Sequence, residues 1–169
     1  MIRVVLGATI FAHGYSHLFR GGRLAGTSGW FASIGMRHAS LNALLASVTE
    51  LVAGAALVVG LLTTLATAAV AATLLVALIT NHMRNGFFIF RPGEGYEYVL
   101  MIIVVALALA ALGPGRWSLD DVLGTDYDGW GALGAAAAIA AASSGAVLLA
   151  SWRPAPSTPK SSDAPRREP

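Results

Sequence analysis

The stretch Leu41–Leu61, LNALLASVTELVAGAALVVGL, decides the class of this protein, because Glu50 is its only ionisable residue. A helix rises about 1.5 Å per residue, so about 20 apolar residues cross the roughly 30 Å hydrocarbon core of a bilayer. The stretch therefore predicts a transmembrane helix. It places the Glu50 carboxyl group roughly 14 Å below one membrane surface by helical rise.

Working outward from this stretch, four further apolar windows predict membrane spans: Ile2–Phe19, Leu65–Met83, Tyr98–Leu112 and Trp130–Trp152. We interpret the first as a span and not a cleaved signal peptide, because no small-x-small cleavage site precedes Gly21. No strand pattern is present, and a backbone in lipid must satisfy its hydrogen bonds internally. The expected fold is all-α, a polytopic membrane helical bundle. The tail 153–169, rich in Pro, Ser and Arg, is expected to be disordered and cytoplasmic.

The composition supports a membrane protein. Of the 169 residues, 56% are hydrophobic and 12% are charged, whereas a soluble domain carries about 25% charged residues. This disfavours a soluble enzyme and leaves the lipid bilayer as the expected partner. The absence of cysteine excludes disulfide scaffolds, thiolate zinc sites, iron–sulfur ligation and thiol catalysis. The net charge of +2 comes from thinly spread basic residues, which suits flanks of membrane spans and not nucleic-acid binding.

The distribution of basic residues predicts the topology. If all five windows cross the membrane, Arg3 and Arg116 lie on one side, together with the acidic run Asp120–Asp128. The other nine basic residues then lie on the opposite side. Because the basic side is cytoplasmic, we expect the N-terminus outside and the C-terminus in the cytoplasm of a multi-pass cytoplasmic membrane protein. Without the fifth span this asymmetry disappears.

Glu50 is the central candidate residue. A charge at its depth costs about 2.5–3.5 kcal/mol on insertion scales, so the carboxyl group should be protonated or paired and should face the bundle interior. The alternative is a neutral, structural glutamate that hydrogen-bonds a neighbouring helix. His13 and His17 are four residues apart and share one face of the first helix.

Further polar candidates lie toward the same membrane surface as the two histidines: Asn81, His82 and Glu97. Such a set can bind a quinone carbonyl, shuttle a proton or hold a metal. A metal site is not assigned, because too few carboxylates accompany the histidines. The alternative is that His17 and His82 simply sit in the headgroup layer.

The connection between the third and fourth windows, GFFIFRPGEGYEY (86–98), is unusually aromatic. Bulky apolar residues before a Pro-Gly turn would not extend into water. We therefore expect Phe87, Phe88, Tyr96 and Tyr98 to form either a lid between helices or an anchor in the membrane interface. In contrast, Gly7, Gly14, Gly54 and Gly60 are interpreted as sites of close helix packing.

Several of these stretches occur in the order typical of one family. They are Ala12-His13-Gly14, Gly29-Trp30-Phe31, Glu50-Leu51-Val52-Ala53-Gly54, His82 with Gly86-Phe87-Phe88, Gly95-Tyr96-Glu97-Tyr98, and Gly113-Pro114-Gly115-Arg116-Trp117-Ser118-Leu119-Asp120. With this order the sequence resembles the DoxX family of small bacterial membrane proteins over about residues 1–124. The position after His-Gly that is usually basic in the family is His17 here.

The resemblance implies a four-helix core at 1–124, to which 125–152 adds a fifth transmembrane helix. It also implies a link to thiosulfate:quinone oxidoreductases, to oxidative-stress proteins or to membrane chaperones. Our leading hypothesis is a quinone- or redox-associated subunit, not a complete enzyme, with a buried centre of Glu50 and His13 and with His17, His82 and Glu97 at its mouth. Quinone is the candidate cofactor, and a protein partner or a homo-oligomer is expected. The alternatives are a non-catalytic scaffold or assembly factor and a small-solute carrier.

Overall fold

The computed structural model describes residues 1–154, and the predicted disordered tail lies outside the described residues from 155 onward. Within 1–154 the chain is helical, with no strand beyond one isolated bridge between Met36 and Trp152. The elements are α1 (Ile2–Phe19), α2 (Arg23–Ser33), α3 (Ala39–Val59), α4 (Thr63–Thr80), the 3-10 helix η1 (His82–Asn85), α5 (Glu97–Leu112), α6 (Leu119–Leu123) and α7 (Gly129–Ser151).

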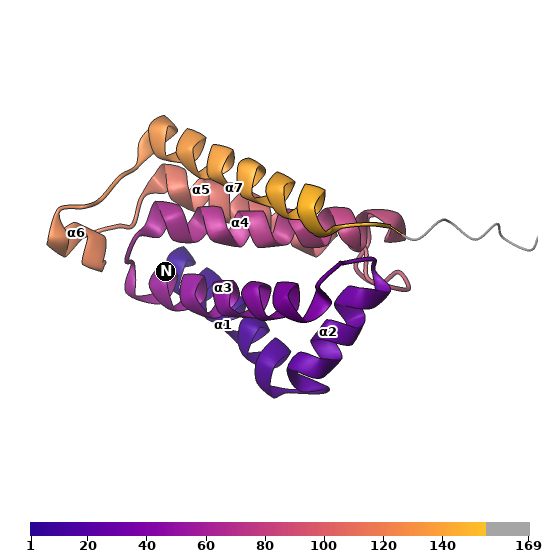
Figure 1. Ribbon diagram of the computed structural model, residues 1–169. Helices are drawn as coiled ribbons and strands as arrows, with labels where there is room; N and C mark the ends of the chain where they lie inside the picture. Colours follow the sequence, from indigo (N-terminus) through magenta and orange to yellow (C-terminus); the bar gives the residue numbers. More distant parts are fainter. Residues whose placement is uncertain (155–169) are drawn as a thin grey trace, which may run out of the picture.

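The five long helices run up and down in one elongated bundle (Figure 1). Helix α4 lies at its centre and packs against α3, α5 and α7, whereas α1 packs mainly against α3. The core is built from small and branched apolar residues such as Leu57, Val70 and Ile103. The predicted all-α membrane bundle is confirmed, with element ends within three residues of the predicted windows.

Three helices combine the length and hydropathy that a membrane crossing requires, namely α3, α4 and α7. Helix α5 is apolar but has only 16 residues. Helix α1 has 18 residues but does not reach that hydropathy, because Arg3, His13 and His17 interrupt it. The crossings by α1 and α5 therefore stay predictions, which their place beside α3 and α4 supports.

Glycines determine how closely α1 approaches α3. A Cβ atom on Gly54 would lie 2.6 Å from the backbone nitrogen of Phe11 and 2.7 Å from the carbonyl oxygen of Gly7. A Cβ atom on Gly14 would lie 2.9 Å from the Cβ of Glu50. Real side chains do not tolerate such distances, so the predicted packing role of Gly7, Gly14 and Gly54 is confirmed.

One end of the bundle, which we call the acidic end, comprises residues 1–3, 60–63 and 113–128. Here Asp120 is only 2% exposed, and its two carboxylate oxygens accept hydrogen bonds from the backbone nitrogens of Leu62 (2.7 Å) and Thr63 (2.9 Å). Its own backbone nitrogen donates to the carbonyl oxygen of Gly60 at 2.8 Å. The segment after α5 thus caps the first turn of α4, where the amide groups lack partners within the helix.

The opposite, basic end comprises residues 20–38, 81–96 and 152–154. The backbone nitrogen of Arg37 donates to Ser151 at 2.7 Å, and that of Arg153 donates to Gly35 at 2.8 Å. The indole nitrogen of Trp152 donates to the carbonyl oxygen of Ile34 at 3.0 Å. These bonds tie the end of α7 to the segment after α2. Helix α7 is thus an integral part of the bundle.

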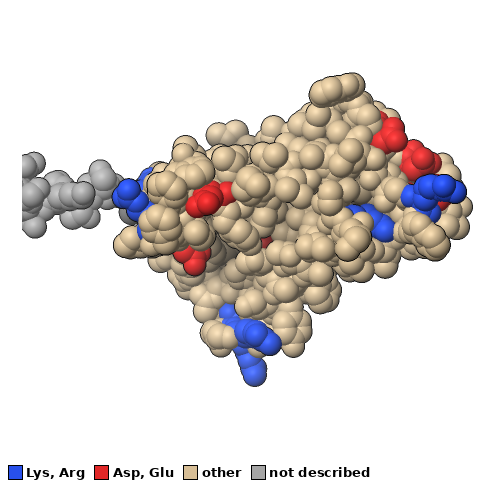
Figure 2. Space-filling view, turned by 180° about the vertical axis from the view of Figure 1, so that it is seen from behind, with Lys and Arg blue, Asp and Glu red and all other residues tan. Residues whose placement is uncertain are grey.

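The charges of the described residues gather at the two ends (Figure 2). The acidic end has four aspartates and two arginines, Arg3 and Arg116. The basic end has six arginines, Arg20, Arg23, Arg37, Arg84, Arg91 and Arg153, and one glutamate, Glu94; Glu97 follows as the first residue of α5. The helices therefore place the connecting segments on alternate ends, as the charge count predicted, while the orientation in the membrane stays a prediction.

Candidate functional site

Within residues 1–154, a cavity lies between α3 on one side and α4 and α7 on the other. Its volume is about 370 Å³, which falls within the range of small-molecule sites. The wall is mainly apolar and includes Leu45, Leu65, Ala69, Ala72, Val76, Ile139 and Val147; its polar residues are His17, Asn42, Thr49, Glu50, Thr73, Thr80, Ser143 and Ser144.

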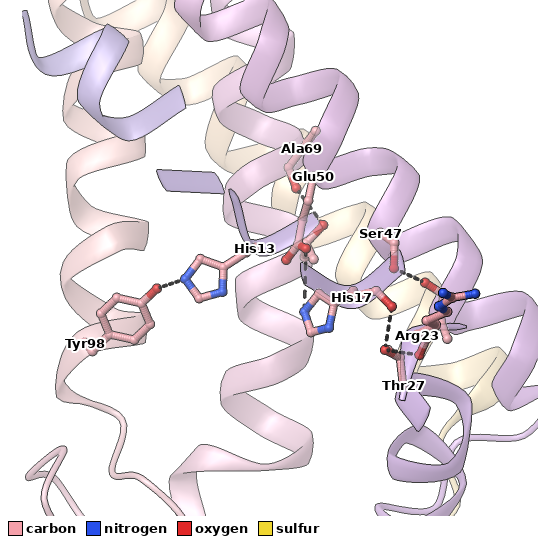
Figure 3. A network of polar contacts seen from close by, with 10 residues as sticks. His13, His17, Arg23, Thr27, Ser47, Glu50, Ala69 and Tyr98 are labelled. Carbon is pink, nitrogen blue, oxygen red and sulfur yellow. Dashed lines mark hydrogen bonds and ion pairs between the residues drawn. The ribbon is translucent and has the colours of Figure 1, made fainter. Parts of the chain in front are cut away.

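Glu50 and His17 form the ionisable pair in this wall. The Glu50 carboxyl group is 8% exposed, and its Oε2 atom has no hydrogen-bond partner. The Nε2 atom of His17 lies 3.7 Å from Oε2, which is close enough for an ion pair and too long for a hydrogen bond. Figure 3 shows the two side chains facing each other from α3 and α1. The prediction that Glu50 faces the bundle interior is confirmed.

The hairpin of α3 and α4 brings the hydroxyl group of Thr73 to the level of the Glu50 carboxyl group. Glu50 lies ten positions before Gly60, and Thr73 lies ten positions after Thr63, so both are at about the same depth. Helix α7 adds Ser144 to the same cavity. Sequence reasoning missed Thr73 and Ser144. In the sequence, each of them is recognisable as a hydroxyl-bearing residue that interrupts an apolar run, and Thr73 does so at the depth of Glu50.

The cavity is closed toward the basic end by Trp30, Phe31, Ile34 and Met36. These residues come from the end of α2 and the turn after it. Helix α2 lies outside the five predicted windows, because it is short and its glycines, Gly26 and Gly29, weaken any helical pattern. Only the tertiary structure places it over the cavity.

Toward the flank of the bundle, the cavity is open. Three of its apolar wall residues, Leu45, Leu65 and Ile139, are exposed on the outer surface. They belong to α3, α4 and α7, which are the three helices that meet the requirements for crossing a membrane. The opening therefore lies on a flank built from these three helices.

The predicted buried centre of Glu50 and His13 requires a correction. The His13 side chain is exposed, and its Nε2 atom shares a hydrogen bond of 2.6 Å with the hydroxyl group of Tyr98 on α5. In Figure 3 the His13 and His17 rings point to different neighbours, although the residues are one helical turn apart. The partner of Glu50 is His17, because helix α1 presents that ring toward α3.

The remaining polar candidates organise the α4–α5 connection and do not line the cavity. His82 is buried, and its Nδ1–H donates to the carbonyl oxygen of Glu94 at 3.0 Å. Asn81 ends α4 and accepts from Asn85 through its carbonyl oxygen. Glu97 accepts from the backbone nitrogen of Ile89 at 3.2 Å. Of the three residues predicted at the mouth of the site, His17, His82 and Glu97, only His17 lines the cavity.

The aromatic loop folds back on itself. The backbone nitrogen of Tyr96 donates to Gly86 at 3.0 Å, and that of Glu97 donates to Phe87 at 2.9 Å. Phe87 and Phe88 are exposed, and neither they nor Tyr96 and Tyr98 line the cavity that contains Glu50. The predicted lid is therefore not formed over this cavity. The exposed rings suit the alternative, an anchor in the membrane interface.

The site can accept and release protons and can hold a polar group inside an apolar slot. Glu50 and His17 both exchange protons, and both contact the same cavity. Within residues 1–154, no group of three His, Asp or Glu side chains converges in a way that suits a metal ion.

These observations define an all-helical integral membrane protein with a carboxyl–imidazole pair in an intramembrane cavity. A family model described as DoxX matches residues 1–83, which include α1, α3, α4 and both members of the pair. The chain belongs to the DoxX family through this segment. No curated protein and no solved structure matches it. The domain limit at residue 124 lies beyond the matched residues and stays a prediction.

Proposed function

We propose that this protein binds a lipid-soluble quinone in the cavity and serves as the membrane subunit of a redox system. The observation that carries the proposal is the Oε2 atom of Glu50, which is buried, lacks a hydrogen-bond partner and lies in the wall of an apolar cavity. A buried polar group without a partner costs about 1–3 kcal/mol. A ligand that contacts this atom would remove that cost.

A quinone suits the shape and chemistry of the cavity. The wall residues of α4 run from Leu65 to Thr80, which corresponds to roughly 22 Å of helix. An aromatic head group would lie at the level of Glu50 and His17, and an apolar tail would leave through the open flank between Leu65 and Ile139. Such a ligand arrives from the bilayer and needs no aqueous path.

The residues of this chain would handle protons, and a protein partner would handle electrons. Conversion of a quinone to a quinol takes up two electrons and two protons. Glu50 and His17 lie beside the cavity and can deliver or accept the protons. The chain has no cysteine for dithiol chemistry or a thiolate-bound cluster, so we propose that electrons come from a partner oxidoreductase.

The test is the quinone content of the purified protein. The full chain would be isolated in mild detergent from its own membranes, and the extracted lipids would be analysed by mass spectrometry. We expect quinone in the wild type and a loss of at least tenfold in the Glu50→Gln and His17→Ala variants. His13→Ala is the matched control and should retain the quinone, because His13 contacts Tyr98 and not Glu50.

Two results would contradict the proposal. Equal quinone content in the wild type, Glu50→Gln and His17→Ala would show that the cavity is not the quinone site. A wild type without quinone that copurifies with a stable protein partner would favour the scaffold alternative.

A further inference from the structure

Two of the hydroxyl groups that line the cavity, those of Thr73 on α4 and Ser144 on α7, have already used their protons. Thr73 donates through Oγ1 to the carbonyl oxygen of Ala69 at 3.0 Å. Ser144 donates through Oγ to the carbonyl oxygen of Ala141 at 3.2 Å. A hydroxyl group has one proton, so only the oxygen lone pairs of these side chains are left for a ligand.

Polar side chains toward the basic end of the cavity also donate their protons to backbone carbonyl groups. Thr80 donates to the carbonyl oxygen of Val76 at 2.8 Å. The amide nitrogen of Asn42 donates to the carbonyl oxygen of Arg37 at 2.7 Å, which leaves its Oδ1 as the acceptor. Four polar side chains from three helices therefore present acceptors to the space that a ligand would fill.

Glu50 adds a further acceptor to this part of the wall. Its Oε2 atom is buried, has no hydrogen-bond partner and accepts hydrogen bonds when the group is ionised. Even a protonated Glu50 brings a single donor against the lone pairs of Thr73 and Ser144. A buried acceptor left without a donor is unfavourable, so a ligand that contacts Thr73, Ser144 and Glu50 is favoured when it supplies O–H or N–H groups.

We propose that the cavity recognises its ligand through hydroxyl donors on an aromatic head group, and that it therefore binds the quinol form in preference to the quinone form. This inference rests on the proposed function and makes it more specific. Thr73 and Ser144 are the specificity-determining residues, because each offers its lone pairs to a ligand hydroxyl group. A carbonyl head group would face these oxygens without any attraction.

The experiment uses two redox-inert probes of similar size, 1-naphthol and 1-methoxynaphthalene, which differ in the donor. Their binding to the full chain in nanodiscs would be measured by calorimetry, after subtraction of partitioning into protein-free nanodiscs. One net hydrogen bond corresponds to roughly a fivefold change in Kd. We expect 1-naphthol to bind at least about fivefold more tightly than the ether.

Two variants with matched controls locate the effect. Thr73→Val and Ser144→Ala should each bring the preference for 1-naphthol below about twofold while leaving the affinity for the ether unchanged. Thr67→Val and Ser47→Ala make the same chemical changes on α4 and α3 at buried hydroxyl groups outside the cavity wall. These two controls should keep the full preference.

The outcomes separate this inference from the proposed function. Equal binding of the two probes, or a preference that survives in both cavity variants, would overturn the donor requirement while leaving the cavity as a site for quinones. Binding of neither probe would overturn both. A preference lost only in Thr73→Val and Ser144→Ala would support both.

Discussion

At the scale of single residues, the contacts of Glu50 support our proposal that the polar centre serves a ligand. A glutamate that sets the helix register would hydrogen-bond a neighbouring helix, whereas the Oε2 atom of Glu50 has no hydrogen-bond partner and faces a cavity. Its nearest ionisable neighbour, His17, lies at 3.7 Å, beyond hydrogen-bond distance. Burial of this oxygen atom therefore lowers the stability of the protein without ligand, because no hydrogen bond compensates for the loss of water.

The Glu50→Leu variant should therefore be more stable than the wild type. Leucine has a similar volume and removes an unpaired buried polar atom, so we expect the free energy of unfolding to rise by about 1–3 kcal/mol. Thermal unfolding in detergent, without added quinone, measures this change. Glu97→Leu is the control and should not stabilise, because Glu97 already accepts a hydrogen bond from Ile89. A lower midpoint for Glu50→Leu would indicate a structural role.

Asp120 illustrates the opposite case, a buried carboxyl group that is fully used by the fold. Burial by itself raises the pKa of Asp120, but hydrogen bonds from Thr63, Leu62 and Thr125 outweigh burial and hold the pKa below its ordinary value. The carboxylate form therefore stabilises the folded state.

Stability should consequently fall in acid. Because the pKa of Asp120 is lower in the folded than in the unfolded state, its stabilisation is complete above the unfolded value of about 3.9 and disappears as the pH falls through the folded value. We expect Asp120→Asn to cost about 1–3 kcal/mol at pH 7 and to show a weaker loss of stability below pH 4. The exposed Asp126→Asn is the control. If the free energy of unfolding fell equally with decreasing pH in the wild type and in Asp120→Asn, this role of Asp120 would be wrong.

At the scale of helices, the glycine contact between α1 and α3 positions the His17–Glu50 pair. Because Gly14 lies against the Cβ of Glu50 and Gly7 lies against Gly54, the helix backbones touch. This approach brings the imidazole on α1 to the carboxyl group on α3. A larger distance between α1 and α3 would separate His17 from Glu50 even where the helices kept the same arrangement.

Gly54→Ala should accordingly destabilise the protein by about 1–3 kcal/mol, since the added Cβ would overlap backbone atoms of Phe11 and Gly7. It should also lower the quinone content of the purified protein by separating His17 from Glu50. Gly145→Ala on α7 is the matched control, because a Cβ there has nothing within 4 Å; we expect that variant to be as stable as the wild type. An unaffected Gly54→Ala variant would show that the contact between α1 and α3 is not tight.

At the scale of the whole molecule, the alternation of the helices gathers the charged residues at two ends (Figure 2), with four aspartates at one and six arginines at the other. The cavity lies between these ends and opens toward the flank, where Leu45, Leu65 and Ile139 are exposed. From the positive-inside rule we expect the basic end to lie in the cytoplasm. A ligand at Glu50 would then enter from the lipid and exchange protons near the middle of the bundle.

Single cysteines test this orientation, because the chain has none of its own. Val122→Cys lies on the acidic end and Ser40→Cys at the start of α3 on the basic end, and both positions are exposed. With an impermeant maleimide added to intact cells, we expect labelling of Val122→Cys alone. Ser40→Cys should react only after permeabilisation. Labelling of both from one side would refute the alternation, and the reverse pattern would refute the orientation.

The sequence by itself determined the features that depend on local properties of the chain. The length of an apolar run predicts a membrane helix, and the placement of Glu50 within such a run predicts a buried carboxyl group. The positions of Arg, Lys and Asp predict the two ends. Each of these conclusions needs only the neighbours of a residue along the chain, so each could be drawn without coordinates.

Only the tertiary structure decided which side chains meet. The choice of His17 over His13 as the partner of Glu50, the donation of Thr73 and Ser144 to the backbone, and the closure of the cavity by α2 all depend on contacts between distant segments. Two histidines one turn apart look equivalent in sequence. The direction of each ring is decided by the helix beside it, and that helix is chosen by close packing at glycines and small residues throughout the bundle.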